Sequence, residues 1–286
     1  MSRYYNQVWG RQEESAPEVA APASHLPAVL DENQQAEEPV KGPKQNFLAH
    51  CRKLILVRRP DVPVIFGQEA LFPVALDSYR SLRTKLMRLM TAQGIKLIVI
   101  SSPNPAEGKT LSTFNLGLTF ARLSDQKILL VDSDLRTGGL TGLLGGRSES
   151  GLSDVLNGEV AFESAVLATN VDNLYVVTAG LSSNRSSEAF ANDRWKQFTQ
   201  WASQHFSIVL VDSPPILPMA DFELIAAACQ GTVLVVRALQ TSRESLSKAV
   251  KQLDQKKFLG TVFNEAGSQA KHGYYAYGSE DGRPTA

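Results

Sequence analysis

Short, almost continuous apolar segments recur through the middle of the chain, each with the length of a buried strand. They lie at residues 96–101, 127–132, 173–178, 206–212, 231–236 and 259–264. Apolar residues at helical spacing fill residues 77–92, 110–123 and 242–253. Apolar strands that alternate with amphipathic helices are typical of a mostly parallel sheet with helices on both faces. The pattern therefore predicts an α/β fold, whose ligand site would lie outside the carboxyl ends of the strands.

Both ends of the chain lack this periodicity. Residues 1–45 are rich in Ala, Pro, Glu and Gln and poor in large apolar residues, which predicts a disordered arm. Residues 266–286 place tyrosines among Gly, Ser and charged residues, which predicts a flexible tail. We therefore expect one folded domain over residues 46–265, with the helix at 77–92 included.

The loop between the strand at 96–101 and the following helix carries the most specific chemistry. Gly108, Lys109 and Thr110 would open the helix, whose first N–H groups and dipole attract phosphate. Lys109 can reach the outer phosphates of a nucleotide, and the Thr110 hydroxyl can ligate magnesium. The strict P-loop pattern has glycine where this chain has Pro103, so the phosphate cradle would come mainly from the amides of residues 106–110. The loop predicts a nucleotide phosphate site, with a purely structural turn as the alternative.

Aspartates stand at the ends of two further strands. Asp132 and Asp134 follow the strand at 127–132, and Asp212 ends the strand at 206–212. Near a P-loop, one carboxylate can hold magnesium while another orients or deprotonates an attacking hydroxyl group. The alternative is that each aspartate only caps the helix that follows it.

Charge and composition narrow the range of partners. Lys and Arg equal Asp and Glu at 29 each, so there is no global electrostatic case for nucleic acid or an anionic membrane. No apolar run approaches the roughly 18 residues of a membrane span, and no signal-peptide pattern opens the chain, so we expect no insertion into a membrane. Cys51 and Cys229 form no disulfide framework or metal motif, and Cys229 lies in an apolar helical run that predicts a buried thiol. A cytoplasmic location fits this cysteine usage.

Taken together, the motifs resemble those of bacterial tyrosine kinases, the cytoplasmic enzymes associated with capsule and exopolysaccharide synthesis. Residues 101–110, 128–136 and 208–217 look like the Walker A, Walker A′ and Walker B motifs of that family. The resemblance runs from about residue 77 to residue 277. The family also lacks the first P-loop glycine, although Ala106 stands here in place of a common family glycine.

The resemblance implies a role for each residue. The implied nucleotide-binding set is Pro105, Ala106, Glu107, Gly108, Lys109, Thr110, Leu111 and Asn264. The implied magnesium ligands are Thr110, Asp132 and Asp212, and the implied catalytic set is Lys109, Asp132, Asp134 and Asp212. Which of Asp132 and Asp134 is the base stays open. Asn264 matches a residue that contacts the nucleotide base in related ATPases, with an asparagine that closes a turn as the alternative.

Two further motifs imply assembly between copies of the chain. Asp77, Arg80 and Arg83 resemble the family's Glu-x-x-Arg-x-x-Arg motif, which contacts the neighbouring subunit in a ring. Aspartate replaces glutamate here, and a solvated helix face is the alternative. Tyr274, Tyr275 and Tyr277 match the tail cluster that neighbouring subunits phosphorylate, and Tyr4 and Tyr5 are a second candidate.

The resemblance thus implies an ATP- and Mg²⁺-dependent tyrosine autokinase that acts in trans and regulates polymer assembly and export. It also implies a membrane polysaccharide co-polymerase as activating partner, a possible tyrosine phosphatase, and a peripheral place at the inner face of the plasma membrane. One alternative is a switch ATPase like the septum-site and plasmid-partition ATPases, although Asn104 stands where they usually place a signature lysine. Another is a non-catalytic nucleotide-binding scaffold of an export complex.

Overall fold

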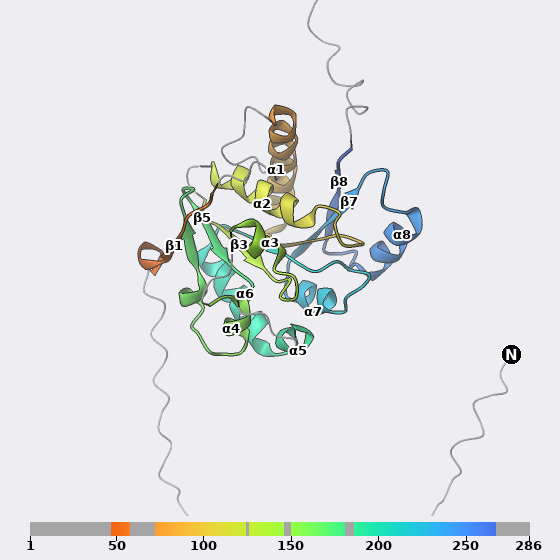
Figure 1. The fold of residues 1–286 in the computed structure, drawn as a ribbon. Coiled ribbons are helices and arrows are strands. Elements are labelled where there is room, and N and C mark those ends of the chain that lie inside the picture. Colours follow the sequence, from red (N-terminus) through yellow and green to blue (C-terminus); the bar gives the residue numbers. More distant parts are fainter. Residues whose placement is uncertain (1–46, 58–71, 124–125, 146–149, 181–185, 267–286) are drawn as a thin grey trace, which may run out of the picture. The chain divides into compact units, whose positions relative to one another are not determined.

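A computed structural model describes residues 47–57, 72–123, 126–145, 150–180 and 186–266. Its centre is an eight-stranded sheet (Figure 1). From one edge to the other, the strands are β1 (Arg52–Leu54), β4 (Leu167–Thr169), β5 (Leu174–Val177), β3 (Ile128–Asp132), β6 (Ile208–Asp212), β2 (Leu97–Ser101), β7 (Gly231–Arg237) and β8 (Phe258–Asn264). Neighbouring strands are parallel except for β4 and β5. The predicted α/β fold with a mostly parallel sheet is confirmed.

Helices cover both faces of this sheet. They are α1 (Pro73–Gln93), α2 (Lys109–Ala121), α3 (Gly139–Leu143), α4 (Leu152–Leu156), α5 (Ser186–Phe190), α6 (Asp193–His205), α7 (Asp221–Ala227) and α8 (Arg243–Gln252). Two short 3₁₀ helices lie at Phe47–His50 and Glu163–Ala165. In Figure 1, α1 and α2 lie above the sheet, whereas α4, α6 and α7 lie below it.

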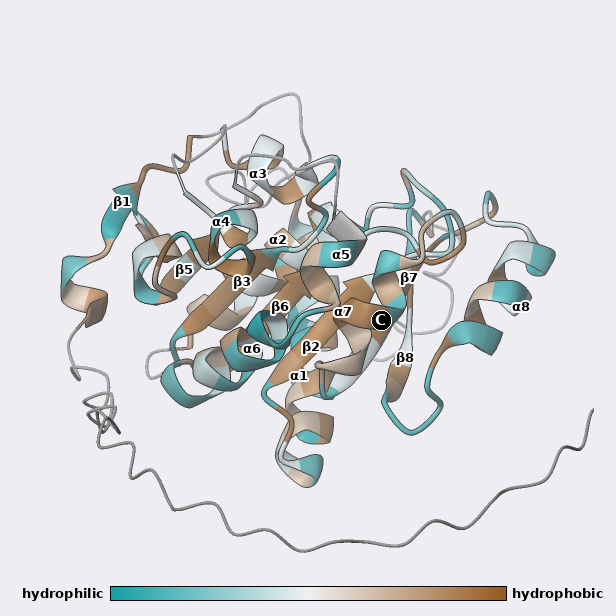
Figure 2. Ribbon diagram, turned by 90° about the horizontal axis from the view of Figure 1, so that it is seen from below, coloured by the Kyte–Doolittle hydropathy of each residue, from teal (hydrophilic) through white to brown (hydrophobic). Residues whose placement is uncertain are grey.

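The two faces of the sheet follow from the alternation of side chains along each strand. On β2, Ile98 and Ile100 join the core that contains Phe114 and Phe120 of α2. Leu97 and Val99 belong to the opposite core, together with Trp195 and Phe198 of α6. Because both faces are covered, the central strands β2, β3 and β6 are apolar up to their last residue, and they appear largely brown in Figure 2.

Several element boundaries differ from the sequence-based expectation. Helix α1 begins four residues before the predicted start at residue 77, because Pro73 suits the first turn of a helix. It ends at Gln93, and the next residue, Gly94, caps it with a left-handed φ of 67°. The sequence pattern predicts no element in residues 133–172 or 179–205, where the structure has α3, α4, β4, α5 and α6. Cys229 is buried as predicted but lies two residues beyond the end of α7, not within a helix.

Part of the predicted organisation lies outside the described residues. This is true of the arm at 1–45 and of the tail beyond residue 266, with its tyrosines. Among the described residues, no helix is both long enough and apolar enough to cross a bilayer.

Candidate functional site

Three neighbouring parallel strands bring the aspartates to one edge of the sheet. Strand β6 lies between β3 and β2, and in its register Asp212 pairs with Asp132 on one side and with Ile100 on the other. The loop after β2 leads into α2, which begins at Lys109. Residues that are about 100 positions apart therefore meet because of the strand order, as the carboxyl-end rule for parallel sheets predicts.

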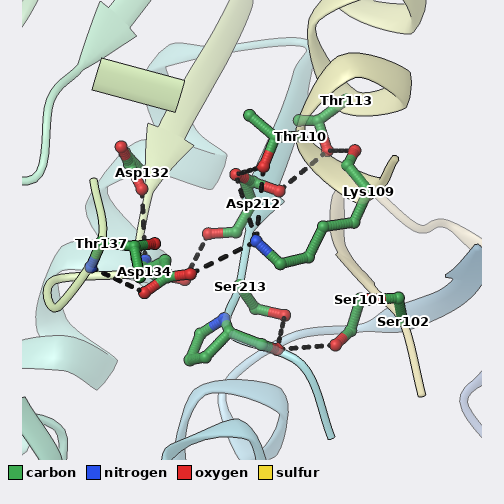
Figure 3. Close-up of polar contacts among 12 residues, drawn as sticks. Ser101, Ser102, Lys109, Thr110, Thr113, Asp132, Asp134, Thr137, Asp212 and Ser213 are labelled. Carbon is green, nitrogen blue, oxygen red and sulfur yellow. Dashed lines mark hydrogen bonds and ion pairs between the residues drawn. The ribbon is translucent and has the colours of Figure 1, made fainter. Parts of the chain in front are cut away.

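Lys109 lies at the centre of the polar cluster in Figure 3. Its Nζ atom is 3.3 Å from Asp134 Oδ2 and 3.9 Å from Asp212 Oδ2. It also donates to Thr110 Oγ1 at 3.3 Å. Lys109 is largely buried, with 8% of its surface exposed, so these contacts form in a partly desolvated site. A cation held this way can bind an anionic ligand strongly because little water screens it.

Asp212 is fully buried, and its carboxylate faces two threonine hydroxyl groups of α2. Thr110 Oγ1 donates to Asp212 Oδ2 at 2.8 Å, and Thr113 Oγ1 lies 3.4 Å from Asp212 Oδ1. Thr113 also donates to the carbonyl oxygen of Lys109 at 2.9 Å. Thr113 belongs to none of the sequence motifs, although its helical spacing from Lys109 puts it on the same face of α2.

Asp132 is held by α3. The backbone N–H and the hydroxyl of Thr141 both donate to Asp132 Oδ2, each at 2.7 Å. The Asp134 N–H donates to Asp132 Oδ1 at 3.2 Å. Asp134 Oδ1 in turn accepts the Thr137 N–H at 3.2 Å. Asp134 therefore faces Lys109 (Figure 3), while Asp132 is hydrogen-bonded to Thr141 of α3. Nothing in the sequence pattern pointed to Thr141.

The electrostatics of this cluster reflect an excess of negative charge. Three buried carboxylates face one lysine, Lys109. Burial, together with the charge of Asp212, raises the pKa of Asp132 to about 7, even though Thr141 donates to it. Burial also raises the pKa of Asp212, despite the opposing effect of Lys109. For Lys109, burial alone would lower the pKa, but the carboxylates outweigh it and the pKa is raised.

This charge balance and donor set fit magnesium. A divalent cation would offset the formal charge of −2 that three carboxylates and one lysine carry. The Thr110 hydroxyl and the Asp212 carboxylate are hard oxygen donors of the kind that Mg²⁺ prefers. The described residues contain no group of three or more His, Cys, Asp or Glu side chains spaced to hold one metal. Mg²⁺ commonly uses one or two carboxylates and completes its shell with substrate phosphates and water.

The loop before α2 is held in place by hydrogen bonds to Glu107, from within the loop and from distant residues. The Asn104 amide donates to Glu107 Oε1 at 3.0 Å, and the Thr241 hydroxyl donates to the same oxygen at 2.7 Å. Asn264 donates to the Glu107 carbonyl oxygen at 3.1 Å. A Cβ atom on Gly108 would collide with the Asn264 amide, and Gly108 has φ of 90°, so glycine is required there for two reasons.

The other predicted loop residues lie as follows. Pro105 and Ala106 are exposed, whereas Leu111 is half-buried and packs against the core on the α1 face. Ala106 has φ of 61°, a left-handed conformation that favours glycine. This conformation gives a physical reason for the common family glycine at this position.

Ala106→Gly should therefore raise the free energy of unfolding by about 0.5–1 kcal/mol, because relief of the left-handed strain exceeds the added entropy of the unfolded chain. Thermal unfolding should show a rise in Tm of about 1–4 °C. The matched control is Ala92→Gly, at an exposed position in α1, which should instead lower the stability by about 0.5–1 kcal/mol. Equal and negative shifts for both variants would contradict the strain at Ala106.

The residues of the motif predicted for oligomer contact lie in two different environments. Arg80 pairs with Asp77 at 3.1 Å on the exposed face of α1. Arg83 instead donates to the Thr119 carbonyl oxygen at 2.6 Å, near the end of α2. This contact of Arg83 is therefore within the chain. Tyr274, Tyr275 and Tyr277 lie outside the described residues.

The comparisons with known proteins agree with this geometry. No protein-family model matches the chain. The tyrosine-protein kinase CpsD of Streptococcus pneumoniae is 30% identical over 207 residues, which cover 71% of this chain and 90% of CpsD. The tyrosine-protein kinase Wzc of Salmonella typhimurium is 28% identical over 87% of this chain, but the match spans only 34% of Wzc.

Solved structures give the same result. The kinase domain of the Escherichia coli tyrosine kinase ETK superposes with a TM-score of 0.67 at 28% identity, over 78% of this chain and 88% of that domain. The septum site-determining protein MinD of Pyrococcus horikoshii, solved with Mg-ADP, shares the fold with a TM-score of 0.52 at 24% identity, over 60% of this chain and 71% of MinD.

The sheet order, the loop before α2 and the cluster around Lys109 define a P-loop nucleotide-binding protein. Within that class, the chain belongs to the family of bacterial tyrosine-protein kinases. The resemblance inferred from the sequence motifs is thereby confirmed.

Proposed function

We propose that this chain is an ATP- and Mg²⁺-dependent tyrosine autokinase that phosphorylates Tyr274, Tyr275 and Tyr277 of a second copy. The observation that carries the proposal is the buried cluster in which Lys109 contacts Asp134 and Asp212 while Thr110 donates to Asp212. These groups supply what phosphoryl transfer needs, which is mainly positioning and electrostatic stabilisation.

The roles of the residues follow from their chemistry. Lys109 would bind the outer phosphates of ATP, and the N–H groups at the start of α2 would bind phosphate oxygens. Thr110 and Asp212 would hold Mg²⁺, with Asp132 as the further ligand that the family resemblance implies. Mg²⁺, when bound, would neutralise charge on the phosphate oxygens of the nucleotide. The cluster would thus bind the triphosphate through its cationic side and leave carboxylates near the reacting hydroxyl.

The transfer itself exchanges one phosphorus–oxygen bond for another. The phenol oxygen of the tyrosine bonds to the γ-phosphorus, and the bond from that phosphorus to the β–γ bridging oxygen breaks. The phenolic proton passes to the carboxylate of Asp132 or Asp134, and ADP leaves with the bridging oxygen.

A product-partition experiment tests this function. The purified full chain is incubated with Mg²⁺ and ATP labelled at the γ-phosphate, with and without the cytoplasmic segment of a candidate membrane co-polymerase. We expect label on tyrosine. Release of all label as inorganic phosphate would favour a switch ATPase, and the absence of ATP turnover in both conditions would favour a scaffold.

The proposed function also includes a membrane partner, a phosphatase and further copies of the chain. We expect a membrane polysaccharide co-polymerase to dock on the chain and activate it, which would bring the chain to the inner face of the membrane. Control of capsule or exopolysaccharide export would follow from the phosphorylation state of the tail, which a tyrosine phosphatase could reverse. Assembly into a ring would use the exposed pair of Asp77 and Arg80 on α1. Phosphate on the tail adds negative charge, which could loosen such a ring by repulsion.

A further inference from the structure

Thr141 makes more contacts with the site than any role in local structure requires. It lies on α3 with 4% of its surface exposed. Its hydroxyl donates to Asp132 Oδ2 at 2.7 Å and accepts the Ala179 N–H at 2.9 Å. Ala179 follows β5, and Asp132 ends β3, so one hydroxyl joins the ends of two strands to α3.

These contacts determine how Asp132 is oriented. Two donors from Thr141 converge on Oδ2, and the Asp134 N–H occupies Oδ1 at 3.2 Å. Rotation of the carboxylate would break two hydrogen bonds of 2.7 Å at once, at a side chain with no exposed surface. Asp134 has a looser set of partners, namely the Thr137 N–H at 3.2 Å and Lys109 Nζ at 3.3 Å.

Capping of α3 does not account for the hydroxyl contact. A carboxylate at a helix start needs only backbone N–H groups, and the Thr141 N–H already meets that need. The side-chain hydroxyl is an additional group aimed at the same oxygen. The hydroxyl contact can therefore be tested on its own, because a substitution at Thr141 removes the hydroxyl and leaves the backbone N–H in place.

We propose that Thr141 is a positioning residue for phosphoryl transfer, whose hydroxyl holds the Asp132 carboxylate in its working orientation. This inference rests on the proposed function, since it assigns Thr141 to the same reaction. Thr141 does not touch the substrate. It acts through Asp132, in the way that second groups orient the ligands and bases of other sites.

Thr141→Val removes the hydroxyl and keeps the branched shape, whereas Thr141→Ser keeps the hydroxyl. We expect Thr141→Val to lower kcat for tyrosine phosphorylation by about 10–100-fold, with KM for ATP changed less than about 3-fold. Thr141→Ser should stay within about 3-fold of the wild-type kcat. Rescue by serine separates the hydroxyl from side-chain volume.

The matched control is Thr119→Val in α2. Thr119 is also buried, and its hydroxyl donates to the Leu116 carbonyl oxygen, away from the carboxylates. It should lower Tm without lowering kcat more than about 3-fold. Thr141→Ala serves as a second hydroxyl-free variant if the valine variant does not fold, and binding of ADP together with thermal unfolding shows which variants are folded.

The outcomes separate this inference from the proposed function. A wild-type chain without phosphotyrosine contradicts the kinase proposal itself. An active wild type, with folded Thr141→Val or Thr141→Ala at wild-type kcat, overturns only the role of Thr141. The same conclusion follows if Thr141→Ser loses as much kcat as Thr141→Val, because the hydroxyl would then not be the group that matters.

Discussion

Replacement of Lys109 by methionine should abolish autophosphorylation, with a fall in rate of about 10³-fold or more. Methionine has a similar length but no charge, so the site loses the cation that contacts Asp134 and Asp212. Removal of one preorganised charge from a buried phosphate site affects the transition state most, because charge moves there during transfer. Phosphotyrosine per chain, measured over time with Mg-ATP, gives the rate.

The matched control for Lys109→Met is Lys248→Met. Lys248 is an exposed lysine on α8 that pairs with Glu244. Its replacement by methionine makes the same chemical change at a position far from the loop in the sequence. We expect its phosphorylation rate to stay within about 2-fold of wild type, as is usual for exposed ion pairs. A folded Lys109→Met chain that keeps a tenth or more of the wild-type rate would rule out the proposed role of Lys109.

Replacement of Asp132 by asparagine should have two opposite effects. It should abolish tyrosine phosphorylation, because the carboxylate that could ligate magnesium or accept the proton is gone. It should also stabilise the fold at neutral pH, because a buried carboxylate with a raised pKa is a source of instability. Loss of activity with a gain in stability is the signature of a residue kept for function.

The pH dependence of this gain has a definite sign. In wild type, the folded-state pKa of Asp132 is about 7, above the value of about 4 in the unfolded chain. The unfolded state therefore releases its proton first, and this group lowers the stability as pH rises from about 4 to about 7. Asp132→Asn removes the titration, so its advantage over wild type should be absent below about pH 4 and complete above about pH 7.

Urea unfolding in EDTA at pH 5 and pH 8 measures this difference. We expect the advantage of Asp132→Asn to grow between the two pH values, to about 2–4 kcal/mol at pH 8. Asp172→Asn, at an exposed position, is the control and should shift the stability by less than about 0.5 kcal/mol. An advantage that shrinks as pH rises would contradict the raised pKa of Asp132.

Among the strands, those buried on both faces are the easiest to predict from the hydrophobic pattern. Strands β2, β3 and β6 are buried at every position because helices cover both sides, and all but the last residue of each is apolar, so their segments stood out in the sequence. The edge strand β1 and its neighbour β4 have only three residues each, which is too short for a pattern to be recognised. Helices α3, α4 and α5 have five residues each and show no helical period for the same reason.

The residues of the site also differ in how far they could be predicted from the sequence. Lys109, Thr110 and the aspartates could be identified because they belong to local motifs at strand ends. Thr141 could not, because it lies on a five-residue helix that shows no helical period. Thr241 could not, because it contacts Glu107 from 134 positions away. The intramolecular contact of Arg83 with Thr119 likewise depends on how α1 packs on α2.

Phosphosite mass spectrometry on a mixture of two chains tests the central claim most directly. One chain is active but carries phenylalanine at Tyr274, Tyr275 and Tyr277, and the other is Lys109→Met with its tail intact. After incubation with Mg-ATP and the co-polymerase segment, we predict phosphate on the tail tyrosines of the Lys109→Met chain. Turnover of ATP without phosphotyrosine on either chain would contradict the assignment of this protein as a tyrosine autokinase.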